Sequence, residues 1–343
     1  MECYHMHDFF TREAPESSVI RWAPERFGCT AGLSPTAELA FLKQHRVDVV
    51  IFQKLSDAVT RELATMCIDQ GIPTVFIICD YVEDLTMVTL CTATIVTSTN
   101  LLDWIKALHP QRDVTCSQYG TEAPPDLTPA YARIKTRDSR LVYLGAVRLA
   151  RDFGFLNRIP GTSLTTIGKY NSYDRRLNSS AGARLWTDLM WRVSDFRHPD
   201  RADTRHANRP LPTTREWRMQ TVYDDMASCD IGILPLLPQQ LSSAIGKMKS
   251  NSRLLSMWGV GLATIASPLR AYAETINHGV DGFIAETRHD WIRLIKLLSS
   301  TPDLRREIGK NARARAFREF GLERQFGEYL AVFRRALERP VGM

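Results

Sequence analysis

Short, uninterrupted apolar runs alternate with helical patterns along most of this chain, and this alternation limits its fold more than any other feature. The runs cover 47–52, 72–79, 93–97 and 114–117 in the first half, and 140–145, 164–168, 230–234 and 263–266 in the second. Helical periodicity fills several of the intervals, at 36–45, 56–70 and 101–108. Strands buried on both faces have this continuous apolar character, and parallel neighbours need a crossover that is usually a helix. The sequence therefore predicts an α/β protein with parallel sheets covered by helices on both faces.

The length of 343 residues favours two domains rather than one. Prolines give residues 120–137 the composition of a linker. We expect a short first domain over 1–132, a second over 133–320 and a terminal helix within 321–343. A polar, arginine-rich stretch at 171–218 predicts weak strands and a long surface loop inside the second domain.

Charge and cysteine usage narrow the function classes. The net charge of +6 suits phosphorylated ligands or an anionic membrane surface, and no nucleic-acid-binding motif accompanies it, so nucleic acid is not an expected partner. No apolar run approaches the ~20 residues of a membrane span, and the N-terminus lacks the apolar core of a signal peptide. We therefore expect a cytoplasmic protein with peripheral membrane contact. The cysteines form no C-x-x-C pair, which predicts buried free thiols rather than a zinc or disulfide framework.

Lys249, Asn251 and Arg253 form the sharpest polar cluster, at the start of a predicted helix between the runs at 230–234 and 263–266. A helix N-terminus has free N–H groups and the positive end of the dipole, so cations placed there call for an anionic partner. Lysine supplies a compact charge, and arginine supplies a fork for phosphate oxygens. A bound anion is the interpretation we favour, and a solvated helix start is the alternative.

Gly145 ends another predicted strand, and Arg148 and Arg151 follow it. A glycine at a strand end lets the backbone approach a ligand closely. The three residues therefore predict a second part of the anion site, or else a plain turn with two surface arginines. The chain has no G-x-G-x-x-G, so a dinucleotide site has little support.

Asp80 directly follows the apolar run at 72–79. Open α/β sheets bind ligands outside the carboxyl ends of their strands, so this carboxylate is placed to hold a substrate hydroxyl or to act as a base. Capping of the following helix is the alternative.

The order of parts over 223–285 resembles the C-terminal domain of nucleotide-sugar glycosyltransferases of the GT-B fold, broadly the family 4 group. The residues that carry the resemblance are the strand 230–234, the Lys-Asn-Arg cluster, the stretch from Gly261 to Ser267 and the Tyr272-Ala-Glu274 sequence. It implies two Rossmann-like domains whose parallel sheets face each other across a cleft. The first domain would lie on the acceptor side and the second would bind the nucleotide sugar, with the last helix crossing back to the first domain.

The chain departs from this family at the family's usual pair of glutamates. Aligned on Gly261, it has Ser256 in place of the ribose-binding glutamate and Met248 in place of the sugar-facing one. Glu274 lies near a glutamate of the family and would contact the nucleoside side of the donor or remain on the surface. The departures fit a divergent branch that uses Lys-x-Asn-x-Arg instead, and they also fit a protein that binds without catalysis.

The resemblance implies transfer of a sugar from a nucleotide-diphosphate donor to a hydroxyl of a carbohydrate, lipid-linked or small-molecule acceptor. Retention of configuration is expected, without a metal or a cofactor other than the donor itself. The catalytic candidates are Asp80, Lys249 and Arg253. The donor-binding candidates are Gly145, Arg148, Arg151, Lys249, Asn251, Arg253, Ser256 and Glu274. A non-catalytic nucleotide-sugar-binding subunit and a GT-B-type nucleotide-sugar epimerase are the alternatives.

Overall fold

A computed structural model describes residues 34–133, 138–145, 155–156, 159–168 and 213–338. The chain divides into two compact units, and each is assembled from separate segments. The first unit contains 1–122, 242–252 and 317–343, and the second contains 123–241 and 253–316. The division predicted from the sequence assumed contiguous domains and therefore gave 242–252 to the second domain.

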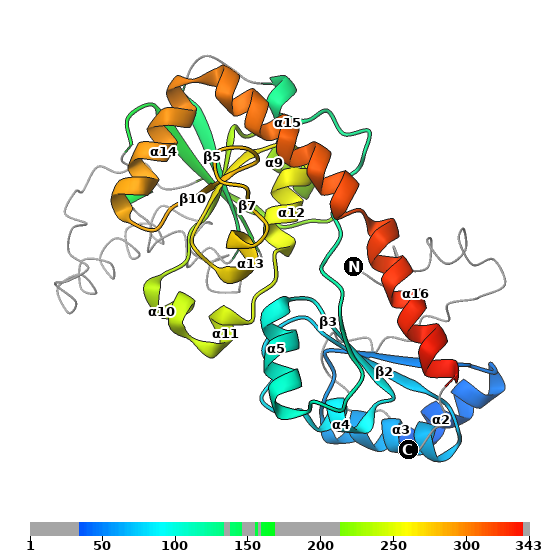
Figure 1. The fold of residues 1–343 in the computed structure, drawn as a ribbon. Coiled ribbons are helices and arrows are strands. Elements are labelled where there is room, and N and C mark those ends of the chain that lie inside the picture. Colours follow the sequence, from blue (N-terminus) through cyan, green and yellow to red (C-terminus); the bar gives the residue numbers. More distant parts are fainter. Residues whose placement is uncertain (1–33, 134–137, 146–154, 157–158, 169–212, 339–343) are drawn as a thin grey trace, which may run out of the picture. The chain divides into compact units, whose positions relative to one another are not determined.

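A parallel four-stranded sheet forms the centre of the first unit (Figure 1). Its strands, in spatial order, are β1 (Val50–Gln53), β2 (Thr74–Ile78), β3 (Ala93–Val96) and β4 (Val114–Cys116). Its helices are α2 (Pro35–Gln44), α3 (Ala58–Asp69), α4 (Thr86–Leu90), α5 (Thr99–Leu108), α11 (Ala244–Lys247) and α16 (Leu322–Glu338). The four apolar runs of the first half therefore become four neighbouring strands, as their pattern predicts.

Both faces of this sheet are buried because alternate strand residues point to opposite sides. On β2, Phe76 and Ile78 pack in a cluster with α2, α3, α4 and α5, whereas Val75 and Ile77 pack against α16. Ser34, Asp57 and Ser98 start α2, α3 and α5, each accepting a hydrogen bond from a backbone N–H of the first turn.

The predicted terminal helix packs on the first unit. Phe326 and Phe333 of α16 are buried, and Leu330, also predicted to face inward, is partly buried against the same cluster. Two hydrogen bonds join the segment after β4 to the C-terminal part of the chain. Thr121 N–H donates to Phe320 O at 2.7 Å, and Gly120 N–H donates to Gln325 Oε1 of α16 at 2.8 Å. The last helix thus completes the core of the first unit.

A parallel six-stranded sheet forms the second unit, in the order β10-β9-β8-β5-β6-β7. The strands are β5 (Ser139–Leu144), β6 (Thr162–Gly168), β7 (Thr213–Glu216), β8 (Ile231–Leu234), β9 (Ala263–Ala266) and β10 (Phe283–Ile284). Its helical elements are η1 (Ala130–Arg133), α9 (Val222–Ala227), α10 (Pro238–Ser242), α12 (Ser252–Gly259), α13 (Arg270–Ala273), α14 (Arg288–Ser300) and α15 (Pro302–Glu319). Of the predicted surface loop at 171–218, only the part from 213, which contains the short strand β7, lies within the described residues.

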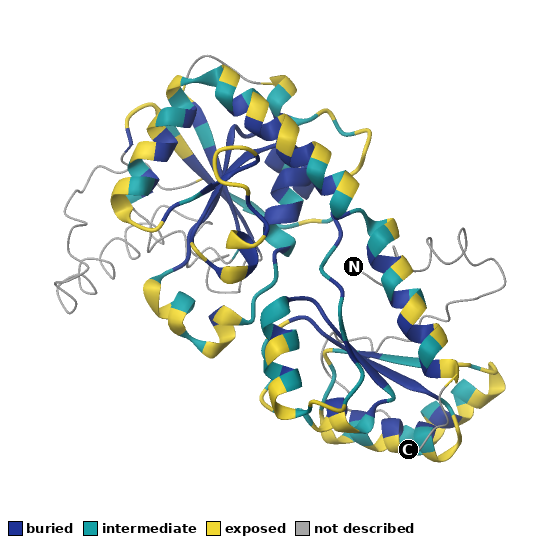
Figure 2. Cartoon of the chain, viewed as in Figure 1, coloured by how far each residue is buried: buried dark blue, intermediate teal, exposed yellow. Residues whose placement is uncertain are grey.

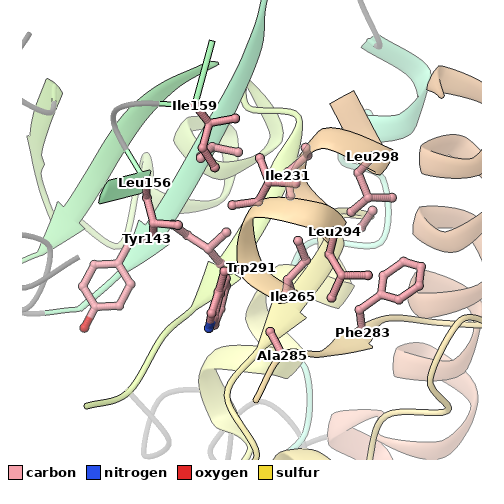
Figure 3. Close-up of a cluster of buried hydrophobic side chains, with 14 of the residues drawn as sticks. Tyr143, Leu156, Ile159, Ile231, Ile265, Phe283, Ala285, Trp291, Leu294 and Leu298 are labelled. Carbon is pink, nitrogen blue, oxygen red and sulfur yellow. The ribbon is translucent and has the colours of Figure 1, made fainter. Parts of the chain in front are cut away.

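One face of this sheet is covered by α14, whose Trp291, Leu294 and Leu298 pack on Ile231 and Ile265 (Figure 3). The opposite face is covered by α12. A Cβ added at Gly232, between two residues of the first face, would lie 2.7 Å from Sδ of Met257, so only glycine lets the helix approach β8 this closely. In both units most strand residues are buried, and the helices expose their outer faces (Figure 2).

The proline-rich linker predicted at 120–137 is docked over its described part. Ala130 N–H donates to Val260 O at 2.8 Å, and the Arg313 guanidinium donates to Pro125 O at 2.7 Å and to Gly259 O. Arg313 is buried and bridges the linker to the C-terminal end of α12. The proline-rich composition therefore predicted correctly a segment with little regular secondary structure. This segment is nevertheless fixed on the second unit by buried hydrogen bonds.

The predicted fold class is confirmed. Two α/β units contain parallel sheets with helices on both faces, and the C-terminal helix packs against the sheet of the first unit.

Candidate functional site

The second sheet reverses its strand order at β5, and this point defines the candidate site. β5 pairs with β6 on one side and with β8 on the other. The chain runs outward from β5 to β6 and β7, then returns to β8 and continues outward to β9 and β10. In open α/β sheets the crevice outside the carboxyl ends of the strands at such a switch point is the usual ligand site.

Gly145 and Arg253 meet at this switch point. Gly145 follows the last residue of β5, and Arg253 lies in the first turn of α12, which connects β8 to β9. A Cβ added at Gly145 would lie 3.1 Å from Nη1 of Arg253 and 2.7 Å from the hydroxyl oxygen of Tyr143. The guanidinium therefore lies directly against the backbone at the end of β5. The sequence analysis named Gly145 and Arg253 from two separate patterns and did not predict this contact.

Two tyrosines, Tyr143 and Tyr272, complete this cluster, and the sequence analysis made neither of them a site candidate. Tyr143 is almost fully buried, and Figure 3 shows its hydroxyl pointing away from the labelled core side chains. Burial raises the pKa of the Tyr272 hydroxyl above its ordinary value, and the positive charge of Arg253 offsets part of this rise. Tyr143 could have been suspected from the sequence because a tyrosine near the end of a buried strand needs a polar environment for its hydroxyl.

Arg253 differs from most arginines of the second unit in having no acidic partner. Arg215 pairs with Asp225, Arg270 with Glu274 and Arg315 with Asp281. Across the described ranges, no ion pair involves Arg253, although its side chain is half-buried. A half-buried cation beside two phenols, a glycine backbone and a helix N-terminus has the electrostatic environment of an anion site.

The other members of the predicted cluster lie outside the helix. α12 begins at Ser252, so Lys249 and Asn251 precede it, whereas the sequence pattern placed all three polar residues in the first turn. Lys249 is half-buried in the turn after α11, and Asn251 is buried immediately before the helix. Ser256, one turn into α12, is half-buried.

Glu274 caps the C-terminal end of α13 and accepts a hydrogen bond from Arg270 Nε at 2.6 Å. Its carboxylate is thus occupied by an (i, i+4) ion pair on an exposed helix. Arg148 and Arg151 lie outside the described residues.

Asp80 belongs to the first unit, at the carboxyl end of β2. Its Oδ2 accepts from Lys54 Nζ at 2.8 Å, and both side chains are exposed. Asp80 caps no helix, because the N-cap residue of the following helix is Leu85. Next to it, the rings of Tyr81 and Trp104 lie 5.3 Å apart.

Two residues at the start of α5 also contact the segment that carries Lys249. Asn100 Nδ2 donates to Lys247 O at 2.5 Å, and the Ser98 hydroxyl donates to Met248 O at 3.4 Å. Ser98 is also the N-cap of α5, and these long-range bonds had no signal in the local sequence pattern.

No group of three or more His, Cys, Asp or Glu that could hold a metal ion occurs in the described part of the chain. Among the helices within the described ranges, none combines the length and the apolar character needed to cross a bilayer.

Comparison with known proteins identifies the fold. Residues 212–331 match the family model described as glycosyl transferase-like. No curated protein sequence matches the chain. A glycosyl transferase-like domain thus lies largely within the second unit, and the chain has the GT-B fold that the resemblance implied.

Several solved structures share this fold at low sequence identity. Sucrose-phosphate synthase from Thermosynechococcus elongatus aligns with a TM-score of 0.60 and 14% identity, over 89% of this chain and 77% of that one. HepE from Anabaena, in complex with UDP, aligns with a TM-score of 0.59 and 11% identity, over 88% of this chain and 82% of its own. WaaG, a glycosyltransferase involved in lipopolysaccharide biosynthesis, aligns with a TM-score of 0.54 and 14% identity, over 100% of this chain and 95% of its own.

Proposed function

We propose that this chain transfers a sugar from a nucleotide-diphosphate donor to an acceptor hydroxyl. The observation that carries the proposal is the Arg253 guanidinium, half-buried against Gly145 at the strand-order switch point and without a carboxylate partner in the described chain. A cation at a helix N-terminus costs roughly 0.3–1 kcal/mol against the dipole, and a bound diphosphate would offset this cost because it is attracted both to the cation and to the dipole.

A uridine nucleotide is the first donor to test. HepE, which shares the fold, has been crystallised with UDP and with UDP-glucose. Gly145, Asn251, Ser256 and Glu274 are our further candidates for donor contacts, together with Arg148 and Arg151 in the segment after Gly145.

In the proposed reaction the acceptor oxygen forms a bond to the anomeric carbon as the bond between that carbon and the β-phosphate oxygen breaks. The electron pair of the broken bond stays on the diphosphate, whose negative charge therefore grows. Arg253 and Lys249 would stabilise this charge more strongly in the transition state than in the bound donor, which is what accelerates the step. The acceptor proton passes to a carboxylate or to the departing phosphate.

Asp80 is our candidate for holding the acceptor hydroxyl. Lys54 engages Oδ2 and fixes the orientation of the carboxylate, and Oδ1 can accept a hydrogen bond from the acceptor. A carbohydrate, lipid-linked or small-molecule acceptor fits this chemistry equally, and a lipid-linked one agrees with peripheral membrane contact of a basic protein. We further propose retention of configuration and a metal-independent reaction, both on the family resemblance.

The test measures donor hydrolysis and transfer across a panel of nucleotide sugars, with Arg253→Ala and Lys249→Ala. We expect each variant to lose roughly 10- to 100-fold in donor affinity or turnover, because a hydrogen bond to a charged group is removed. Arg306→Ala is the control, since Arg306 lies exposed on α15 and pairs with Asp303.

The other outcomes separate the alternatives. Binding of a nucleotide diphosphate without turnover would favour a non-catalytic binding subunit, and conversion of a free nucleotide sugar into its epimer would favour an epimerase. Unchanged affinity in both variants would overturn the site assignment.

A further inference from the structure

The segment that carries Lys249 is held by the first unit, although the helix that follows it belongs to the second. Residues 242–252 form part of the first unit, and from Arg253 onward α12 belongs to the second. Lys249 and Arg253 are therefore close in the chain but depend on different cores for their support. The contacts that position the backbone around Lys249 therefore lie within the first unit.

The start of α5 supplies that support through three contacts. The Asn100 amide donates to Lys247 O at 2.5 Å, and the Ser98 hydroxyl donates to Met248 O at 3.4 Å. The Met248 side chain packs against the buried cluster of the first unit that also contains Leu101 and Ile105. The start of α5 thus holds two consecutive carbonyls, and the Met248 side chain packs on the buried cluster of the same unit.

The hydrogen bonds on these carbonyls have different strengths. Ser98 already accepts a hydrogen bond from Leu101 N–H as the cap of α5, so its contribution to the turn is its single O–H donor at the longer distance. Asn100 has no part in the cap and makes the shorter bond. Asn100→Ala therefore removes the shorter of the two bonds on the turn and keeps the Ser98 cap of α5.

We infer that Asn100 is a positioning residue for the diphosphate site: its amide holds the Lys247 carbonyl and thereby sets the position of Lys249. This inference rests on the proposed function. Without Asn100 the turn gains conformational freedom, and the donor must restore its order on binding, which weakens the apparent affinity. The net value of one such hydrogen bond, about 1 kcal/mol, corresponds to a loss of about fivefold.

The experiment is a double-mutant cycle on nucleotide affinity. The dissociation constants of UDP, GDP, ADP, CDP and dTDP are measured by calorimetry for the wild-type protein, and the tightest of them is used for Asn100→Ala, Lys249→Ala and the double variant. If Asn100 acts through Lys249, Asn100→Ala weakens binding about fivefold in the wild type and less than twofold in the Lys249→Ala background. An equal loss in both backgrounds would contradict the inference.

Further variants separate positioning from a general loss of stability. Asn100→Asp keeps the shape of the side chain but places a carboxylate oxygen, which can only accept hydrogen bonds, next to the Lys247 carbonyl. We expect nucleotide affinity to fall at least as far as in Asn100→Ala. Asn311→Ala is the matched control, because Asn311 Nδ2 makes the same kind of bond, to Val280 O at 2.9 Å, in the second unit. We expect it to leave affinity unchanged, and a similar loss there would mean that any such bond has this effect.

Failure of the proposed function gives a different result from failure of this inference. If Arg253→Ala weakens binding but Asn100→Ala does not, the donor site stands and the positioning role is wrong. If no nucleoside diphosphate binds the wild-type protein, the proposed function fails and the positioning role fails with it.

Discussion

At the scale of single residues, Arg253 and Gly145 determine what the candidate site can bind. The guanidinium lies against a position where any side chain would be too close. Because Gly145 has no Cβ, the Arg253 guanidinium and the Tyr143 hydroxyl can both approach the backbone at the end of β5. The contact therefore links a structural requirement to the proposed binding role.

Gly145→Ala tests this contact. The new Cβ would lie 2.7 Å from the Tyr143 hydroxyl and 3.1 Å from Arg253 Nη1, so we expect a stability loss of about 1–3 kcal/mol and weaker nucleotide binding. Calorimetric affinity and urea unfolding are the measurements. Gly161→Ala is the comparison: it has a φ of +73° with only Asp138 Oδ1 nearby, at 3.6 Å, and should lose stability without losing affinity. Unchanged affinity in Gly145→Ala would separate Gly145 from the site.

The buried thiol of Cys67 gives the first unit a pH dependence. Burial raises the pKa of Cys67 to about 11, whereas a thiol in the unfolded chain titrates near about 8.5. The unfolded state therefore releases its proton first as pH rises. The stabilisation is fully present below pH ~8.5 and is lost as pH rises through about 11.

We expect this thiol to reduce the free energy of unfolding by about 2 kcal/mol between pH 8 and pH 10, on top of the contributions of other groups. Urea unfolding of the wild type and of Cys67→Ala at both pH values isolates the effect, because the variant lacks the thiol. Parallel pH dependence in the two proteins would show that Cys67 does not contribute. The free, buried state of Cys67, Cys79, Cys91 and Cys229 agrees with the prediction made from the sequence.

At the scale of elements, close approach of backbones holds α15 against the rest of the second unit. A Cβ added at Gly309 of α15 would lie 2.4 Å from the carbonyl oxygen of Gly261, in the turn between α12 and β9. Tyr131 of η1 packs on the same turn and would meet a Cβ at Gly261 at 2.7 Å. The turn, the linker and α15 thus form one tightly packed junction.

Replacement of two helical glycines should therefore have opposite effects. Glycine to alanine inside a helix normally stabilises by about 0.5–1 kcal/mol. We expect this gain for Gly327→Ala on α16, where nothing lies within 4 Å of the new Cβ. For Gly309→Ala we expect a loss of about 1–3 kcal/mol from overpacking. Thermal unfolding of both variants is the test, and a stabilised Gly309→Ala would mean that the junction can relax.

Element positions were largely predictable from the sequence, because burial on a strand or on one side of a helix leaves a local periodic pattern. The strand β9 was predicted at 263–266 and is observed at Ala263–Ala266, and the terminal helix predicted within 321–343 is observed at Leu322–Glu338. The helix after the Lys-Asn-Arg cluster begins later than predicted, since the residues before it form the separate turn α11. Polar residues such as Lys, Ser and Asn occur both in the turn before a helix and in its first turn, so the sequence alone does not fix where the helix begins.

At the scale of the whole molecule, each unit is completed by chain segments that are distant in sequence. α16 closes the first sheet, and Phe326 is buried there against strands that precede it by most of the chain. The stability of the first unit therefore depends on the C-terminal helix.

Phe326→Ala should destabilise the first unit by about 3–5 kcal/mol, the usual cost of deleting a buried aromatic ring. Native-state hydrogen exchange should accelerate in β2 and β3 and remain unchanged in β8 and β9, which belong to the second unit. Leu337→Ala, on the same helix but 48% exposed, should have little effect on either sheet. Equal acceleration in both sheets would show that the two units unfold together.

The sequence by itself determined which segments become strands and helices and that the sheets are parallel, because those properties follow from local patterns of apolar residues. It also led us to predict that Gly145 and Arg253 belong to an anion site, and this stays a prediction. Only the tertiary structure decided that these two residues touch, that Lys54 pairs with Asp80, and that Asn100 holds the turn before Lys249. Such contacts depend on strand order and on which core each segment joins, and a local sequence pattern determines neither.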